Sequence, residues 1–217
     1  FGVFTMAWLP YLLPSYGEAT TLSGILAMAG SILVAFKNWR KIDWHKLTPI
    51  LITFIVSSCA SIHFVSVADD HLLKRILGVM LIIASLWFLA ISKHVKVKPT
   101  LPVQITMGTI SGVMGGLFAM HGPAAVLYFL ACAKDKDEYV VLTMTYLLLG
   151  NIMMLGFRIH NGFLTPAVGH AFLYGIFAVA IGTWVGSKVF HRLSTDVVKK
   201  ISYAYIAISG VLSLVMS

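Results

Sequence analysis

Apolar stretches of about 20 residues alternate with short charged connections along the whole chain. A hydrocarbon core of about 30 Å requires this spacing of the helices that cross it. The pattern predicts eight elements, at Phe1–Tyr16, Thr20–Phe36, Leu47–Val67, Leu72–Ile91, 101–133, Tyr139–Phe157, Pro166–Val189 and Val197–Met216.

Composition agrees with a lipid environment. The 217 residues are 59% hydrophobic and 11% charged, whereas a soluble domain has about 25% charged residues. No charged linker or low-complexity tract divides the chain. We therefore expect one all-α integral membrane protein and exclude a soluble enzyme with a large core.

The stretch "GGLFAMHGPAAVLYF" at 115–129 is unusual for a membrane helix. It lies inside the uncharged run 101–133, yet it holds Gly115 and Gly116 and then the run His121-Gly122-Pro123. Glycine permits unusual backbone dihedrals, and proline suits the first turn of a helix. We predict two half-helices with a break between them, the second one covering Pro123–Ala131. A kinked but continuous helix is the alternative.

The chain also resembles itself. "FTM" at 4–6 recurs as "FAM" at 118–120, "ILVAFKNWR" aligns with "MMLGFRIHN", and "HLLKRILGVM" aligns with "DVVKKISYAY", all in the same order. This predicts two repeats, 1–98 and 99–217, each a re-entrant or broken helix pair followed by three transmembrane helices. The second repeat has residues before its "FAM" that the first lacks, so we expect further sequence upstream of Phe1.

The basic residues favour a particular topology. If 101–133 crosses the membrane once, the sixteen Lys and Arg divide evenly between the two sides. If it enters and leaves on one side, thirteen lie on that side, and only Lys74, Arg75 and Arg158 lie on the other. The positive-inside rule favours the second arrangement, in which the two repeats are inverted. We expect Arg158 to reach toward the lipid headgroups, with a role in anion access as the alternative.

The positions of the charged residues also indicate which class of solute is transported. The net charge of +8 comes from basic residues at the ends of apolar spans, so it indicates membrane orientation and no nucleic acid. All eight acidic residues, Glu18 among them, are predicted to lie in connections, which disfavours cation transport. A half-helix N-terminus attracts anions instead, and His121 adds a donor there.

At these residues the sequence resembles the sulfite exporter TauE/SafE family, also called the toluene-sulfonate uptake permeases. "GTISGVMGGLFAMHGPAAVLYFLA" resembles that family's run Gly-x-x-Ser-Gly-x-x-Gly-Gly ahead of a Gly-Pro, and "NWRKIDW" resembles its basic connection. His121 stands where the family more often has glycine. The resemblance implies a multi-pass carrier of a bacterial-type plasma membrane for sulfite, sulfonates, sulfoacetate or similar anions.

We hypothesise that the two breaks meet, so that "FTMAW" faces "AMHG" and the helices after each break add hydroxyl and amide groups. The predicted substrate-binding residues are Thr5, Trp8, Ser23, His121, Gly122, Pro123, Ala124, Ala125, Thr145 and Asn151. The expected partners are a small anion and membrane lipid, with a homo-oligomer left open. No cofactor, no metal and no catalytic residue is expected.

Three other functions stay open at this point. A passive anion channel would use the same re-entrant hairpins. An intramembrane hydrolase would need Ser111 and His121 as a positioned pair. A membrane-anchored interaction subunit would not need paired breaks.

Overall fold

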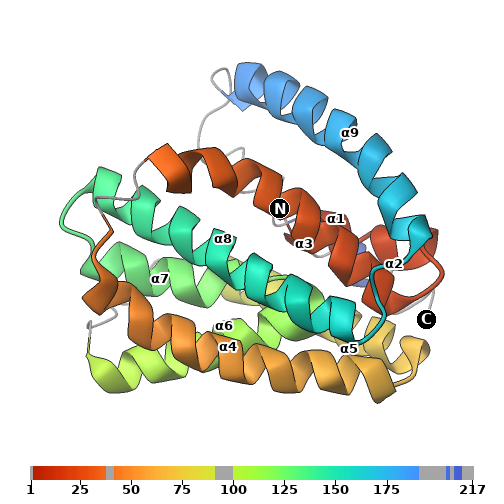
Figure 1. Ribbon diagram of the computed structural model, residues 1–217, viewed down its shortest axis with the longest axis horizontal. Coiled ribbons are helices and arrows are strands. Elements are labelled where there is room, and N and C mark those ends of the chain that lie inside the picture. Colours follow the sequence, from red (N-terminus) through yellow and green to blue (C-terminus); the bar gives the residue numbers. More distant parts are fainter. Residues whose placement is uncertain (1, 38–41, 91–99, 191–203, 206–207, 212–217) are drawn as a thin grey trace.

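The computed structural model describes residues 2–37, 42–90, 100–190, 204–205 and 208–211, which contain helices and no strand (Figure 1). The helices are α1 (Gly2–Met6), α2 (Leu9–Leu12), α3 (Tyr16–Lys37), α4 (Trp44–Val67), α5 (Asp70–Ala90), α6 (Leu101–Phe118), α7 (Gly122–Cys132), α8 (Lys136–His160) and α9 (Pro166–Phe190). Most of the predicted element Val197–Met216 lies outside the described residues, although 204–205 and 208–211 are helical.

The prediction of a membrane protein built from helices is confirmed. Among the described residues, α4, α6 and α8 are long and apolar enough to cross a membrane. The predicted start of the second element is wrong. Helix α3 begins at Tyr16, before the predicted Thr20, so Glu18 lies in its first turn and is buried rather than in a connection. A carboxylate in this position complements the partial positive charge of a helix N-terminus.

Helices α4 and α6 lie side by side, run in the same direction and approach each other closely along a glycine stripe. A Cβ added at Gly108 would lie 1.9 Å from Oγ1 of Thr53, and one at Gly116 would lie 2.5 Å from Cβ of Ser61. Gly112, between them, faces Phe54 and Ser57. Small residues let helix backbones come this near in a membrane. The stripe therefore joins α4 and α6 into one unit.

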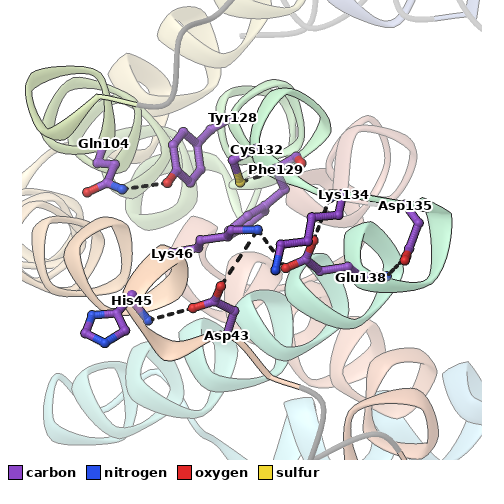
Figure 2. Close-up of polar contacts among 10 residues, drawn as sticks. All are labelled: Asp43, His45, Lys46, Gln104, Tyr128, Phe129, Cys132, Lys134, Asp135 and Glu138. Atoms are coloured by element: carbon purple, nitrogen blue, oxygen red, sulfur yellow. Dashed lines mark hydrogen bonds and ion pairs between the residues drawn. The ribbon is translucent and has the colours of Figure 1, made fainter.

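The starts of α4 and α8 lie at the same end of the bundle. Figure 2 shows Lys46 between Asp43 and Glu138; its Nζ lies 2.7 Å from Oε1 of Glu138 and 3.7 Å from Oδ2 of Asp43. Asp43 and Asp135 each cap a helix, because their side chains accept main-chain N–H groups in the first turns of α4 and α8. These ionic and capping contacts fix where both helices begin.

Helix α7 doubles back along α6. Gln104, in the first turn of α6, donates from Nε2 to the hydroxyl of Tyr128 in the second half of α7 over 2.6 Å (Figure 2). Since α8 then starts beside the start of α4, the chain returns through α7 to the end of the bundle where α6 began. The predicted break is present, and its two halves form a hairpin.

Helix α3 packs against α8 in the opposite direction. Gly17 faces Phe163, just after α8, while Gly24 faces Asn151 within it. In Figure 1, α9 lies outside α3, and α8 lies between α3 and α4. Helix α1 meets the hairpin at its tip, where a Cβ added at Gly2 would lie 2.2 Å from the carbonyl oxygen of Ala119. The interior of the bundle is therefore bounded by α3, α4, α6, α7 and α8.

Candidate functional site

The tip of the α6–α7 hairpin ends helix α6 with a left-handed residue. Ala119 has φ 54°, its N–H donates to the carbonyl of Gly115, and the N–H of Met120 donates to that of Met114. The first of these bonds is that of the αL motif, which satisfies a terminal carbonyl of a helix and usually has glycine at the left-handed position. His121 follows as the N-terminal cap residue of α7. The break is thus a defined turn rather than a kink.

A hydrogen-bonded chain holds this turn against α8. The hydroxyl of Tyr146 donates to Oγ of Ser111 over 2.7 Å, and the Ser111 hydroxyl donates to the main-chain carbonyl of His121. Phe54 and Phe129 pack edge-on against the Tyr146 ring. The Ser111 hydroxyl bonds to the backbone of His121 and not to its imidazole, so the pair lacks the geometry of an activated nucleophile.

His121 and Asn151 form the polar centre between the hairpin and α8. Nδ2 of Asn151 lies 3.2 Å from Nε2 of His121 and donates to the carbonyl of Leu147 over 2.8 Å. The two side chains are 4% and 2% exposed. Nδ1 of His121 and Oδ1 of Asn151 are buried with no hydrogen-bond partner in the part of the chain that the structure describes. Buried polar atoms without partners cost about 1–3 kcal/mol each, so they are expected to bind something.

Arg158 is the largest fully buried side chain among the described residues, with 2% of its surface exposed. Its Nη1 donates to the carbonyl of Thr20 in α3 over 2.9 Å, and its Nη2 donates to that of Gly115 in α6 over 3.2 Å. Its Nε has no partner, and within the described chain no ion pair includes it. A buried cation without a counter-charge is strongly unfavourable. The arrangement therefore suits an anion from outside the chain.

Gly24 lies close against both Arg158 and Asn151. A Cβ added there would lie 2.8 Å from Nη1 of Arg158 and 3.4 Å from Oδ1 of Asn151. The two atoms thus flank one point on α3. The polar centre made by His121, Asn151, Arg158 and Gly24 is called the central site below.

The other predicted site residues are distributed unevenly around it. Thr5 and Ser23 share a hydrogen bond of 2.6 Å, which joins α1 to α3. Thr145 is fully buried, and its hydroxyl has no hydrogen-bond partner among the residues described. Trp8 is 56% exposed, and its indole donates to Tyr205 over 2.7 Å, away from the central site. Gly122, Pro123, Ala124 and Ala125 form the first turn of α7, where both alanines are buried.

Met6 and Met120 lie in one apolar cluster with Ala119, so the "FTM" and "FAM" segments are brought together. Among the described residues, no group of three His, Cys, Asp or Glu side chains is arranged to hold a metal ion.

The predicted position of Arg158 was wrong. It was expected to reach toward the headgroups, but it points into the protein and bonds to two carbonyls. The physical reason is that α8 continues to His160, three residues beyond its predicted end, so Arg158 is still part of the helix. Asn151, Met154 and Arg158 are all buried and recur at helical spacing, which is the signal that identifies one inward face.

Comparison with known proteins gives one match. A family model described as "Sulfite exporter TauE/SafE" matches residues 1–213. No curated protein matches the chain, and no solved structure does. The matched range includes the hairpin and every residue of the central site. The family match agrees with the resemblance seen in "GTISGVMGGLFAMHGP", and the chain belongs to the sulfite exporter TauE/SafE family.

Proposed function

We propose that the protein is a multi-pass transporter of the plasma membrane that carries sulfur-containing anions such as sulfite, sulfonates or sulfoacetate-like compounds by alternating access. Membership of a sulfite exporter family supports this class of cargo. The observation that carries the proposal is Arg158, a buried guanidinium that lacks an acidic partner among the described residues. An anion bound beside it would supply the missing charge.

The hairpin supports a re-entrant segment. Helix α7 has 11 residues, so it is about 16 Å long and too short to cross a hydrocarbon core of about 30 Å. Irregular backbone at such depth is tolerated where it is buried in protein or lines a cavity. The tip at Ala119–His121 is buried, as this requires.

Helix direction supports inverted repeats, 1–98 and 99–217. Helices α3 and α8 hold the matching segments "ILVAFK" and "MMLGFR", and they run in opposite directions. Helix α1, which holds "FTM", would then correspond to the end of α6, and α2 would correspond to α7. Helix α1 also meets the hairpin tip. In transporters of this design the substrate lies at the interface of the repeats.

The positions of the two carbonyls to which Arg158 donates support alternating access. One of its bonds goes to α3 and the other to α6, which is joined to α4 by the glycine stripe. If α3 moves against the α4–α6 unit, the anion replaces one of the two carbonyls that accept from Arg158. The central site then becomes accessible from the other side of the membrane. His121 and Asn151 would orient the bound anion.

Uptake of labelled sulfite into proteoliposomes tests the proposal. We expect saturable uptake that unlabelled sulfite on the opposite side accelerates, which a passive channel would not give. Arg158→Gln should reduce uptake about 100-fold or more, because breaking a buried ionic contact costs about 3–5 kcal/mol. Arg75→Gln, at an exposed position on α5, is the matched control and should transport normally. Normal uptake by Arg158→Gln would contradict the proposal.

A further inference from the structure

The central site offers an unusual set of unused hydrogen-bonding atoms. Nε of Arg158, Nδ1 of His121 and Oδ1 of Asn151 are all buried, and none has a hydrogen-bond partner among the described residues. All three belong to side chains that are at most 4% exposed. Two of these residues come from α8 and the third from the hairpin tip, so the set exists only where the elements meet.

The bonds already made decide which of these atoms donate. Nδ2 of Asn151 must donate, because it faces the carbonyl of Leu147, which only accepts. It also faces Nε2 of His121, which therefore accepts, so the imidazole proton lies on Nδ1. Arg158 Nε is always a donor. The site thus presents two donors and, at Oδ1 of Asn151, one acceptor.

The charge of the site is a single positive unit. Arg158 supplies it, while His121 is neutral in the tautomer that these bonds define. On the facing helix α3, the titratable groups whose side chains the structure describes are Tyr16 and Glu18, both buried and neither within an ion pair in the described part of the chain. A monoanion would neutralise Arg158. A dianion would leave a net negative charge in the protein interior, at a large desolvation cost.

We propose that the central site selects a singly charged sulfur oxyanion that carries its own O–H group, which is hydrogen sulfite in its hydroxyl form. Two oxygens accept from Arg158 and His121, and the hydroxyl donates to Oδ1 of Asn151. Sulfonates have the right charge but leave Oδ1 unpaired, and sulfite and sulfate are dianions. This inference rests on the proposed function and narrows its substrate class.

Asn151 is then the residue that makes the site selective for hydrogen sulfite over sulfonates. A site built to accept a hydrogen bond from its substrate rejects the analogue that lacks the donor, because its own polar atom stays unpaired. Arg158 separates monoanions from dianions. Gly24, which has no side chain, lies beside both residues.

The test compares three labelled anions in proteoliposomes from mildly acidic to mildly alkaline pH. They are sulfite, methanesulfonate and sulfate, each at fixed total concentration. Hydrogen sulfite loses its proton near neutral pH, so sulfite uptake should fall as pH rises, in proportion to the hydrogen sulfite fraction. Methanesulfonate remains a monoanion throughout, so its slower uptake should not change with pH. This arm controls for titration of His121, Tyr16 or Glu18. Sulfate uptake should be negligible.

The variant Asn151→Ala completes the test. It should lower the preference for hydrogen sulfite over methanesulfonate by about tenfold, which corresponds to about 1.4 kcal/mol. Its methanesulfonate uptake reports whether the variant folds, and the pH series on the unmodified protein stands without it. Sulfite uptake that rises with pH, sulfate uptake at a comparable rate or an unchanged preference in Asn151→Ala would each overturn this inference while the proposed function stands. Absence of saturable uptake for all three anions would instead overturn the proposed function.

Discussion

The two ends of helix α8 hold charged side chains in opposite surroundings. At its start, Glu138 pairs with Lys46, and the two side chains are 13% and 20% exposed. Near its end, Arg158 is 2% exposed and bonds only to main-chain carbonyls. The more solvated charge has a partner, while the buried charge has none within the described chain. A fold that needed both charges for stability alone would pair the buried one first.

This difference separates two roles for charge in the molecule. The Lys46–Glu138 pair joins α4 to α8 where both helices begin, together with the helix caps (Figure 2). Arg158 instead keeps a charge available beside atoms that also lack partners. The first arrangement supports the fold, and the second is suited to a ligand. Substitutions at the two ends should therefore affect different measurements.

Charge reversal should give the largest contrast. Arg158→Glu replaces the cation of the central site with an anion, so we expect labelled sulfite uptake to fall by about 100-fold or more. Lys46→Glu breaks a partly exposed pair and should change uptake by about fivefold at most. Proteoliposome uptake at matched protein levels measures both. Equal losses in the two variants would remove the distinction between the ends of α8.

A methyl group at Gly24 should give the next largest effect. In Gly24→Ala the new Cβ would lie 2.8 Å from Nη1 of Arg158. That atom is the end of a flexible side chain, so the guanidinium moves and the fold is kept. We expect the KM for sulfite to rise about tenfold, since small misplacements of a binding group are costly, with an unchanged Tm. Gly156→Ala, on α8 where nothing lies within 4 Å, is the control and should change neither value. An unaltered KM in Gly24→Ala would place the anion elsewhere.

Removing one hydroxyl should give a smaller, purely structural effect. Tyr146→Phe deletes the donor to Ser111 and so loosens the chain that ends at the carbonyl of His121. The expected cost is about 1 kcal/mol of stability. Thermal unfolding in detergent measures it, with Tyr174→Phe on the exposed face of α9 as the control. A Tyr146→Phe protein as stable as the unmodified one would mean that the turn is held by packing alone.

Much of the fold was predictable because a helix that crosses a membrane needs about 20 consecutive apolar residues, and such runs are visible in the sequence. The hairpin break was predicted from Gly115, Gly116 and the His121-Gly122-Pro123 run, and the structure has it at Ala119–His121. Glycine and proline act locally, so their effect is visible without knowing the neighbours. What the pattern did not indicate is the left-handed turn at Ala119, a residue with no preference for that conformation.

The central site was predictable only in part, for a geometric reason. His121 and Asn151 were predicted because polar residues inside apolar spans stand out. Arg158 was missed because it follows the last apolar residue of its span, and helix ends are uncertain by a few residues. A shift of three residues changes an arginine from a surface group to a buried one. Glu18 was misplaced in the same way at the start of α3. Whether a residue beside the end of a span is buried or exposed therefore depends on tertiary contacts, which the sequence pattern does not show.

The smallest expected effect tests the paired end of α8. Lys46→Gln, Glu138→Gln and the double variant form a thermodynamic cycle for their 2.7 Å contact. We expect a coupling free energy of about 0.5–1 kcal/mol in thermal unfolding, because the pair is partly solvated. The coupling should shrink as salt is added, since exposed charges are screened. Sulfite uptake, which is expected to depend on Arg158, should not change over the same salt series, because Arg158 is buried. A coupling well above this range, insensitive to salt, would mean that the Lys46–Glu138 pair is itself desolvated, and the two ends of α8 would then differ in pairing but not in environment.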